Sequence, residues 1–217
     1  MEVKVVQNIL KVNEKLADEN RRLFEEKQVF VIDMMASPGA GKTSTILATI
    51  QALREKLRIA VIEGDIASKV DAEKIQAQGV EAVQINTGGA CHLDGNMIQN
   101  ALRVLDLDAI DLLIIENVGN LVCPAEFDLG QAMKLVISSV PEGDDKPLKY
   151  PVIFTQADAL ILNKVDLMAS VDFDEEAFVS AVRRLNPSAP IFNISATKGE
   201  GVSEWTAWLL ERVVGRG

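Results

Sequence analysis

The sequence predicts an α/β protein in which helices cover both faces of a mostly parallel sheet. Two observations support this fold class. Short apolar and β-branched runs alternate along the chain with charged, helix-favouring stretches. Most of these runs are apolar throughout, which is typical of strands that are buried on both faces of a parallel sheet.

About seven runs are expected to form strands. They are residues 29–36, 58–65, 80–86, 111–117, 134–140, 158–164 and 189–195. A chain of 217 residues is long enough for one full-sized domain and leaves little room for a second. We therefore expect one α/β domain over 28–217, preceded by a separate helix over 1–27.

The N-terminal helix is predicted to be amphipathic. Its apolar residues recur at spacings of three, four and seven, so they form one narrow stripe. The stripe consists of Val5, Ile9, Val12, Leu16 and Leu23. We expect this stripe to pack back on the α/β domain. The alternative is a helix that docks a partner or a second subunit.

Composition excludes several classes of partner. The net charge of −10 opposes general binding to nucleic acid phosphates. The apolar runs are too short to cross a bilayer, and the N-terminus lacks the apolar core and cleavage site of a signal peptide. Two cysteines without an export signal indicate a reducing compartment. We therefore expect a cytoplasmic protein that binds neither nucleic acid nor membrane.

A glycine-rich loop, ASPGAGKTS at 36–44, lies between the first predicted strand and a helical stretch. This is the context of a P-loop, whose backbone amides and helix N-terminus surround nucleotide phosphates, and it predicts the three-layer P-loop fold. Lys42 is expected to reach the β- and γ-phosphates, and the Thr43 hydroxyl to coordinate Mg²⁺. Ala36 stands where the G-x-x-x-x-G-K-[ST] pattern has its first glycine. The predicted phosphate-binding residues are Pro38, Gly39, Ala40, Gly41, Lys42, Thr43 and Ser44.

The base is predicted from a second motif, Asn163-Lys164-x-Asp166, directly after a strand. A carboxylate at Asp166 can accept hydrogen bonds from guanine N1–H and its exocyclic amine, whereas adenine would leave a buried carboxylate unpaired. The Lys164 stem can lie along the base, and Asn163 can brace the loop. Ser195 and Ala196 fit a second guanine-contacting loop. Alone, the motif is also compatible with a solvated loop, but after a P-loop it predicts GTP or GDP.

Two acidic residues are candidates for the Mg²⁺ site, because both end predicted strands at the edge where such sheets bind ligands. We assign Asp65 to the Mg²⁺ shell and switch I, and Glu116 to the Walker B position, directly or through a water. A helix cap or a turn carboxylate is the alternative for each. Lys42, Asp65 and Glu116 form the predicted catalytic set. No glutamine is clearly placed to orient an attacking water, so hydrolysis is expected to be slow and to depend on assembly.

The only histidine, His92, follows Cys91 between glycines, and the second cysteine, Cys123, lies seven residues past Glu116. In a P-loop fold these two loops would leave the same sheet edge, where the three side chains would converge. Two thiolates and an imidazole suit Zn²⁺ or Ni²⁺, and an open fourth position suits an ion that is handed over. Free buried cysteines and a histidine bonded to a backbone carbonyl are the alternatives.

The segments SPGAGKTS, NTGGACHLDG, ENVGNLVCPAEFDLG, LNKVDL and SATKGEG together resemble the HypB family of GTPases, which assist nickel insertion into [NiFe]-hydrogenase. The resemblance runs from about residue 30 to the C-terminus. It implies a P-loop fold, a GTP-dependent homodimer, and Cys91, His92 and Cys123 as ligands of Ni²⁺ or Zn²⁺. It also implies a HypA-type accessory protein and the hydrogenase large-subunit precursor as partners. The chain departs from some members because it lacks an N-terminal cysteine motif and a histidine-rich tract.

Two other functions compete with this interpretation. One is a GTPase accessory protein for another nickel enzyme, of the urease type UreG. The other is a non-catalytic scaffold that binds guanine nucleotide and metal with a vestigial P-loop. The CHLDG and NVGNLVCP segments favour the hydrogenase branch, and the intact Lys42, Thr43 and Asp166 favour an active nucleotide site.

Overall fold

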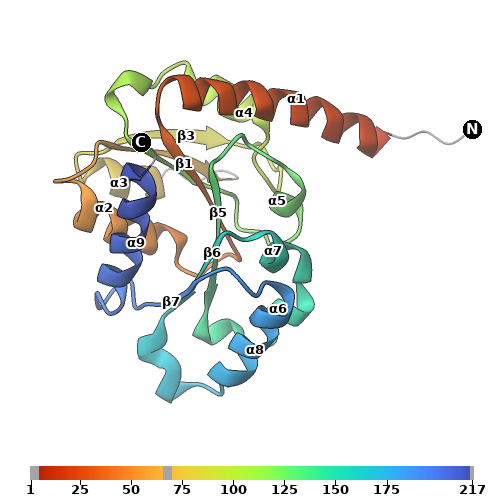
Figure 1. Ribbon diagram of the computed structural model, residues 1–217, viewed down its shortest axis with the longest axis vertical. Helices are drawn as coiled ribbons and strands as arrows, with labels where there is room; N and C mark the ends of the chain where they lie inside the picture. Colours follow the sequence, from red (N-terminus) through yellow and green to blue (C-terminus); the bar gives the residue numbers. More distant parts are fainter. Residues whose placement is uncertain (1–4, 66–69, 216–217) are drawn as a thin grey trace, which may run out of the picture.

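The computed structural model describes residues 5–65 and 70–215 (Figure 1). Within these ranges, seven strands form one all-parallel sheet in the order β3-β2-β4-β1-β5-β6-β7. The strands are β1 (Phe30–Ala36), β2 (Ile59–Asp65), β3 (Glu81–Asn86), β4 (Leu112–Glu116), β5 (Met133–Ser139), β6 (Ala159–Asn163) and β7 (Ile191–Asn193). Six of them fall within a predicted run, and β5 begins one residue before its run, at Met133, so the predicted α/β fold class is confirmed.

The helices lie on both faces of the sheet, with α2 and α9 on one side and α6, α7 and α8 on the other (Figure 1). The α-helices are α1 (Val5–Glu26), α2 (Lys42–Leu53), α3 (Val70–Gln76), α4 (Gly95–Leu102), α5 (Cys123–Glu126), α6 (Lys146–Lys149), α7 (Pro151–Gln156), α8 (Glu175–Leu185) and α9 (Val202–Val214). Short 3₁₀ turns are η1 (Leu107–Ala109), η2 (Val140–Glu142) and η3 (Val165–Ser170).

The core is divided by the sheet because successive strand residues point to opposite faces. On one face, Ile32 and Met34 of β1 pack with α2 and with Trp205 of α9. On the other face, Val31 belongs to a cluster with α4 and the end of α1. The fully buried Trp205 donates its indole N–H to the Thr49 hydroxyl at 3.0 Å, which joins α9 to α2 through a satisfied polar contact.

Helix α1 packs on the domain, but through a different face from the one predicted. The buried residues are Asn13, Ala17, Asn20 and Phe24. Of the predicted stripe, Leu16 and Leu23 are half-buried, Ile9 and Val12 are exposed, and the side chain of Val5 lies outside the described residues. The docking face differs from the predicted one because it is polar. Backbone groups on the domain surface need hydrogen-bond partners, and Asn13 and Asn20 provide them.

The two asparagines fasten α1 to the loop ends beneath it. Asn13 accepts from the Gly95 amide at 2.7 Å and donates to the Asp128 carbonyl at 2.8 Å. Asn20 donates to the carbonyls of Gly95 and Leu129, both at 3.1 Å. Because these groups are largely buried, the contacts determine where α1 lies on the domain.

Replacing Asn20 with alanine is expected to destabilise the protein by about 1–3 kcal/mol, because two buried carbonyls would lose their donor. Urea unfolding, followed by circular dichroism, measures the change. Asn100→Ala, at an exposed position of α4, is the matched control and is expected to change stability by less than about 0.5 kcal/mol. Equal effects of the two substitutions would contradict this account of α1 docking.

Asp33 is a carboxylic acid in the centre of the sheet, with no exposed surface. It accepts a hydrogen bond from the Asn117 side chain at 3.1 Å. Burial raises the pKa of Asp33 to about 7, although the bond from Asn117 and the charge of Lys134 oppose the shift. Between about pH 4 and pH 7 the folded protein therefore binds more protons at this site than the unfolded chain does. The stability contributed by the neutral acid is present at low pH and is lost as the pH rises through the folded pKa.

Asp33→Asn is expected to remove this pH dependence. The unfolding free energy of the variant, relative to that of the unsubstituted protein, should rise by about 2–3 kcal/mol between pH 5 and pH 8. Urea titrations at several pH values measure the difference. Asp172→Asn, at an exposed position, should give a difference that stays flat with pH. A flat difference for Asp33→Asn as well would show that the buried acid does not titrate in this range.

Candidate nucleotide and metal site

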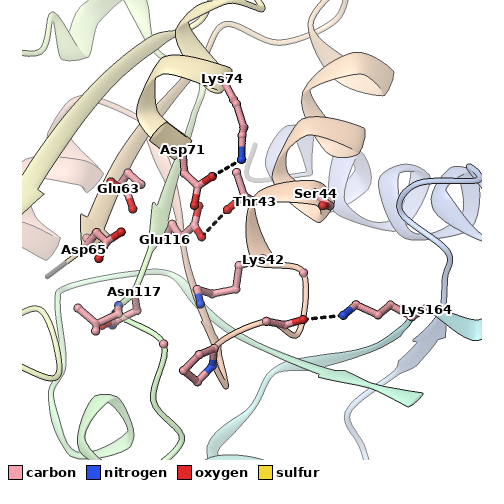
Figure 2. A pocket seen from close by; sticks show the side chains of 16 residues that line it. Lys42, Thr43, Ser44, Glu63, Asp65, Asp71, Lys74, Glu116, Asn117 and Lys164 are labelled. Carbon is pink, nitrogen blue, oxygen red and sulfur yellow. Dashed lines mark hydrogen bonds and ion pairs between the residues drawn. The ribbon is translucent and has the colours of Figure 1, made fainter. Parts of the chain in front are cut away.

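The P-loop connects β1 to α2 at the carboxyl edge of the sheet, as predicted. Gly41 has φ +100°, a conformation that favours glycine, and it directly precedes the first turn of α2. Lys42, Thr43 and Ser44 follow in that turn and line a cavity of about 480 Å³ together with Pro38 and Gly39 (Figure 2). The backbone amides of a helix N-terminus and the extended Lys42 side chain meet here, which suits a polyphosphate.

The predicted base-binding loops lie against the P-loop. Asn163 donates to the Ala40 carbonyl at 2.9 Å and accepts from the Ala196 amide at 3.1 Å, so it braces both loops as expected. The Lys164 ammonium donates to the Gly39 carbonyl at 2.6 Å. Ser195 is buried, and Asp166 lies in η3 with an exposed side chain. The expected burial of Asp166 is not found, because it lies in η3, which has no buried residues.

A group of acidic side chains faces the P-loop across the cavity (Figure 2). The Thr43 hydroxyl donates to Glu116 at 3.0 Å, which brings together two of the three residues predicted for the Mg²⁺ site. Glu63 of β2 is paired in register with Glu116 of β4, and Asp65 is the last residue of β2. Residues 66–69, which follow Asp65, lie outside the described residues. Asp71, in the first turn of α3, also lines the cavity and pairs with Lys74 at 2.7 Å.

The electrostatics of this group favour a bound cation. Burial raises the pKa of Glu63 to about 8, and the negative charge of Glu116 adds to the shift. Burial raises the pKa of Glu116 to about 7, against the opposing effects of Lys42 and the Thr43 hydrogen bond. One buried oxygen of Glu63 and one of Glu116 have no hydrogen-bond partner among the described residues. Hard carboxylate and hydroxyl oxygens of this kind fit Mg²⁺, which would satisfy unpaired oxygens of this group.

The cysteine and histidine side chains converge, as the sequence suggested. The Cys91 sulfur lies 2.9 Å from the Cys123 sulfur and 3.6 Å from His92 Nδ1. The three donor atoms all lie within 4.8 Å of one another. The residues come from two loops: Cys91 and His92 follow β3, and Cys123 begins α5. The alternative of a histidine bonded to a backbone carbonyl has no such bond among the described contacts.

This donor set fits a soft or borderline cation. A tetrahedral ion with metal–sulfur bonds of about 2.3 Å would separate the two sulfurs by about 3.8 Å, so binding requires only a small movement of one loop. Burial lowers the pKa of His92, so its imidazole is neutral and available as a ligand near pH 7. The Cys123 contact and burial raise the pKa of the Cys91 thiol. The His92 ring stacks on Phe127 with centroids 3.8 Å apart, which orients it.

Several residues of the site were not predicted from the sequence. Glu63 could have been predicted from the sequence, because it lies two positions before Asp65 and strand residues two positions apart point to the same face of the sheet. Asp71, Asn117 and Asn120 had no such signal. Asn120 donates to the Cys91 carbonyl at 3.2 Å and thereby links the two metal-binding loops.

Comparison with known proteins identifies the family. Residues 30–193 match the family model for the CobW/HypB/UreG nucleotide-binding domain. The chain is 52% identical over 207 residues to the hydrogenase maturation factor HypB of Azotobacter vinelandii, an alignment that covers 95% of this chain and 68% of that protein. It is 41% identical over 215 residues to the hydrogenase/urease maturation factor HypB of Helicobacter pylori, covering 97% and 88%.

Solved structures agree with this assignment. The crystal structure of Helicobacter pylori HypB in complex with nickel matches with a TM-score of 0.88 and 40% identity, and covers 93% of this chain and 94% of that one. The HypB structure from Archaeoglobus fulgidus matches with a TM-score of 0.88 and 38% identity, covering 94% and 99%. No helix among the described residues is long and apolar enough to span a membrane. These matches, together with the P-loop and the Cys–His–Cys cluster, show that the chain belongs to the CobW/HypB/UreG family, and within it to the HypB maturation factors.

Proposed function

We propose that this protein is a cytoplasmic GTPase that carries nickel and assists its insertion during [NiFe]-hydrogenase maturation. The observation that carries the proposal is the convergence of Cys91, His92 and Cys123 within 4.8 Å, in a loop pair that leaves the same sheet edge as the P-loop. The names of the relatives support it, since they include hydrogenase maturation factors and a nickel-bound structure.

The nucleotide in this proposal is GTP, bound by the P-loop and read by Asp166. Lys42 neutralises phosphate charge, and Thr43, Asp65 and Glu116 hold Mg²⁺, which supplies charge stabilisation to the phosphoryl group. The Asn163 bridge between Ala40 and Ala196 keeps the base-binding and phosphate-binding loops in one geometry. Hydrolysis is expected to be slow, because no glutamine is clearly placed to orient the attacking water.

Nickel is the cargo, and Zn²⁺ is the alternative occupant of the same donors. Three protein ligands leave a coordination position open, and Cys91 is exposed, so an acceptor can approach the ion. Nucleotide state is coupled to metal affinity, since the segment that follows Glu116 leads directly into Cys123. GTP binding and dimerisation tighten these loops, and hydrolysis relaxes them and releases the ion.

The partners in this proposal are a second copy of the chain, a HypA-type accessory protein and the hydrogenase large-subunit precursor. Helix α1 supports a docking role, because Ile9 and Val12 are 52% and 62% exposed. They line an apolar groove with Phe127, whose ring stacks on His92. A partner in this groove would lie beside the metal-binding loops.

Urease maturation is the second candidate, favoured by one observation: the Helicobacter pylori relative is named as a hydrogenase/urease maturation factor. Pull-down with the hydrogenase large-subunit precursor and the urease apoprotein separates the two. Retention of the hydrogenase precursor alone supports the first assignment, and retention of urease alone overturns it.

Asp166→Asn is expected to change base preference. The amide can no longer accept two hydrogen bonds from guanine, so GDP affinity should fall by about 100-fold or more. It can pair with the N1–H and the C2 carbonyl of xanthine, so XDP affinity should rise. Calorimetric titration with GDP and XDP measures both values, and Asp172→Asn is the exposed control. An unchanged GDP/XDP ratio would rule out Asp166 as the base-reading residue.

Cys123→Ser is expected to weaken nickel binding by about 10- to 100-fold, because a hydroxyl replaces a soft thiolate ligand. Competition titration against a chromophoric chelator measures the affinity. Glu126→Gln, an exposed carboxylate on the same helix, is the matched control and should leave the affinity unchanged. If Cys123→Ser binds nickel as tightly as the control, the metal ligands lie elsewhere.

A further inference from the structure

Asn117 directly follows Glu116, has no exposed surface and joins its own segment to two others, strand β1 and the loop at Leu93. Its backbone amide donates to the Met34 carbonyl of β1 at 3.0 Å. Its side-chain oxygen accepts from the Leu93 amide at 3.1 Å and from the Val118 amide at 3.0 Å. Its side-chain nitrogen donates to both oxygens of Asp33, at 3.1 and 3.3 Å.

The orientation of this amide follows from Asp33. A carboxyl group on β1 needs a donor, so the NH₂ of Asn117 faces the sheet and its oxygen faces the backbone amides. Leu93 follows His92 directly, so the accepted bond holds the end of the metal loop, defined here as residues 88–95. The Leu93 side chain is also fixed, since it is fully buried over Gly64. A Cβ at Gly64 would lie 2.8 Å from the Leu93 side chain.

Asn117 also lies at the wall of the nucleotide cavity. Asn117, Val118 and Gly119 line that cavity, and a Cβ at Gly119 would lie 3.0–3.1 Å from Pro38 of the P-loop. Gly119 therefore lies close to Pro38 with no room for a side chain between them, and a movement of the P-loop rim would displace the backbone next to Val118. The Asn117 oxygen is shared by Val118 and Leu93, so a displacement of one amide changes the hydrogen bond to the other.

We propose that Asn117 is the positioning residue that transmits nucleotide state to the metal loop, with Asp33 as its anchor in the sheet. This inference rests on the proposed coupling between GTP and nickel, and it assigns that coupling to one buried amide. A second link, from Asn120 to the Cys91 carbonyl, is exposed and contacts neither Asp33 nor Leu93 among the described hydrogen bonds. Because Asn120 itself joins the two metal-binding loops, the exposed Asn100 of α4 serves as the matched comparison instead.

The test measures nickel affinity by competition titration in the presence of GDP and of a non-hydrolysable GTP analogue. In the unsubstituted protein, the two affinities should differ by at least about fivefold. In Asn117→Ala the ratio should fall to within about twofold of one, while nickel still binds. Asn100→Ala should keep most of the ratio.

Exchanging the side chains of Asn117 and Asp33 distinguishes a positioning role from a general loss of structure. Asn117→Asp places two carboxyl groups face to face, so they must share one proton or repel each other, and the ratio should also fall. Combining it with Asp33→Asn restores one donor and one acceptor in the opposite order, and leaves a carboxylate oxygen to accept from Leu93. The double variant should recover most of the ratio. Circular dichroism and GDP titration show which variants are folded.

Hydrogen exchange at the Leu93 amide gives a measurement that needs no substitution. Its protection should differ between the GDP and GTP-analogue states of the unsubstituted protein. Equal protection in the two states, or an unchanged nickel ratio in folded Asn117→Ala, would overturn the role of Asn117 and leave the coupling intact. Failure of the folded double variant to recover the ratio would also overturn it. A nickel ratio of one in the unsubstituted protein would overturn the coupling itself, and this inference with it.

Discussion

Strand β4 lies between β1 and β2 in the parallel sheet, and the geometry of the site depends on this placement. Parallel strands end at one edge, so the loop after β1, the end of β2 and the loop after β4 meet there. The register aligns Glu116 with Met34 on one side and Glu63 on the other. Any order that separated β4 from β1 would part Thr43 from Glu116. It would also carry Cys123 away from the phosphate loop.

The metal loop must span a longer distance than the other loops, because β3 is the outer strand and only β2 adjoins it. To reach Cys123 the chain after β3 must cross the end of β2. It does so at Gly64, where the absence of a side chain lets the Leu93 side chain pack closely on β2. The Thr87 amide donates to the Asp65 carbonyl at 2.9 Å and begins this crossing. One glycine in β2 thus sets how closely the metal ligands approach the nucleotide cavity.

The strands and motif positions were predictable because they depend on local signals: apolar runs, glycine spacing and residues that follow strands. The convergence of Cys91 with Cys123 was predictable only through the assumed sheet order. The docking face of α1 was not predictable, because Asn13 and Asn20 are buried by backbone groups far away in sequence. Asn117 escaped prediction for the same reason, since its partners Asp33 and Leu93 come from other segments.

The two candidate cation sites differ in the chemistry that selects an ion. The nucleotide cavity offers hard oxygens that are mostly buried, and burial raises the pKa of Glu63 and Glu116, so a resident cation there offsets a charge that the protein otherwise disfavours. The sulfur and imidazole donors are softer, and Cys91 is exposed. An ion at that site can be approached from solvent and exchanged without disturbing the buried carboxylates. In the proposed function, a fixed Mg²⁺ and a transferable nickel ion would therefore not compete for the same ligands.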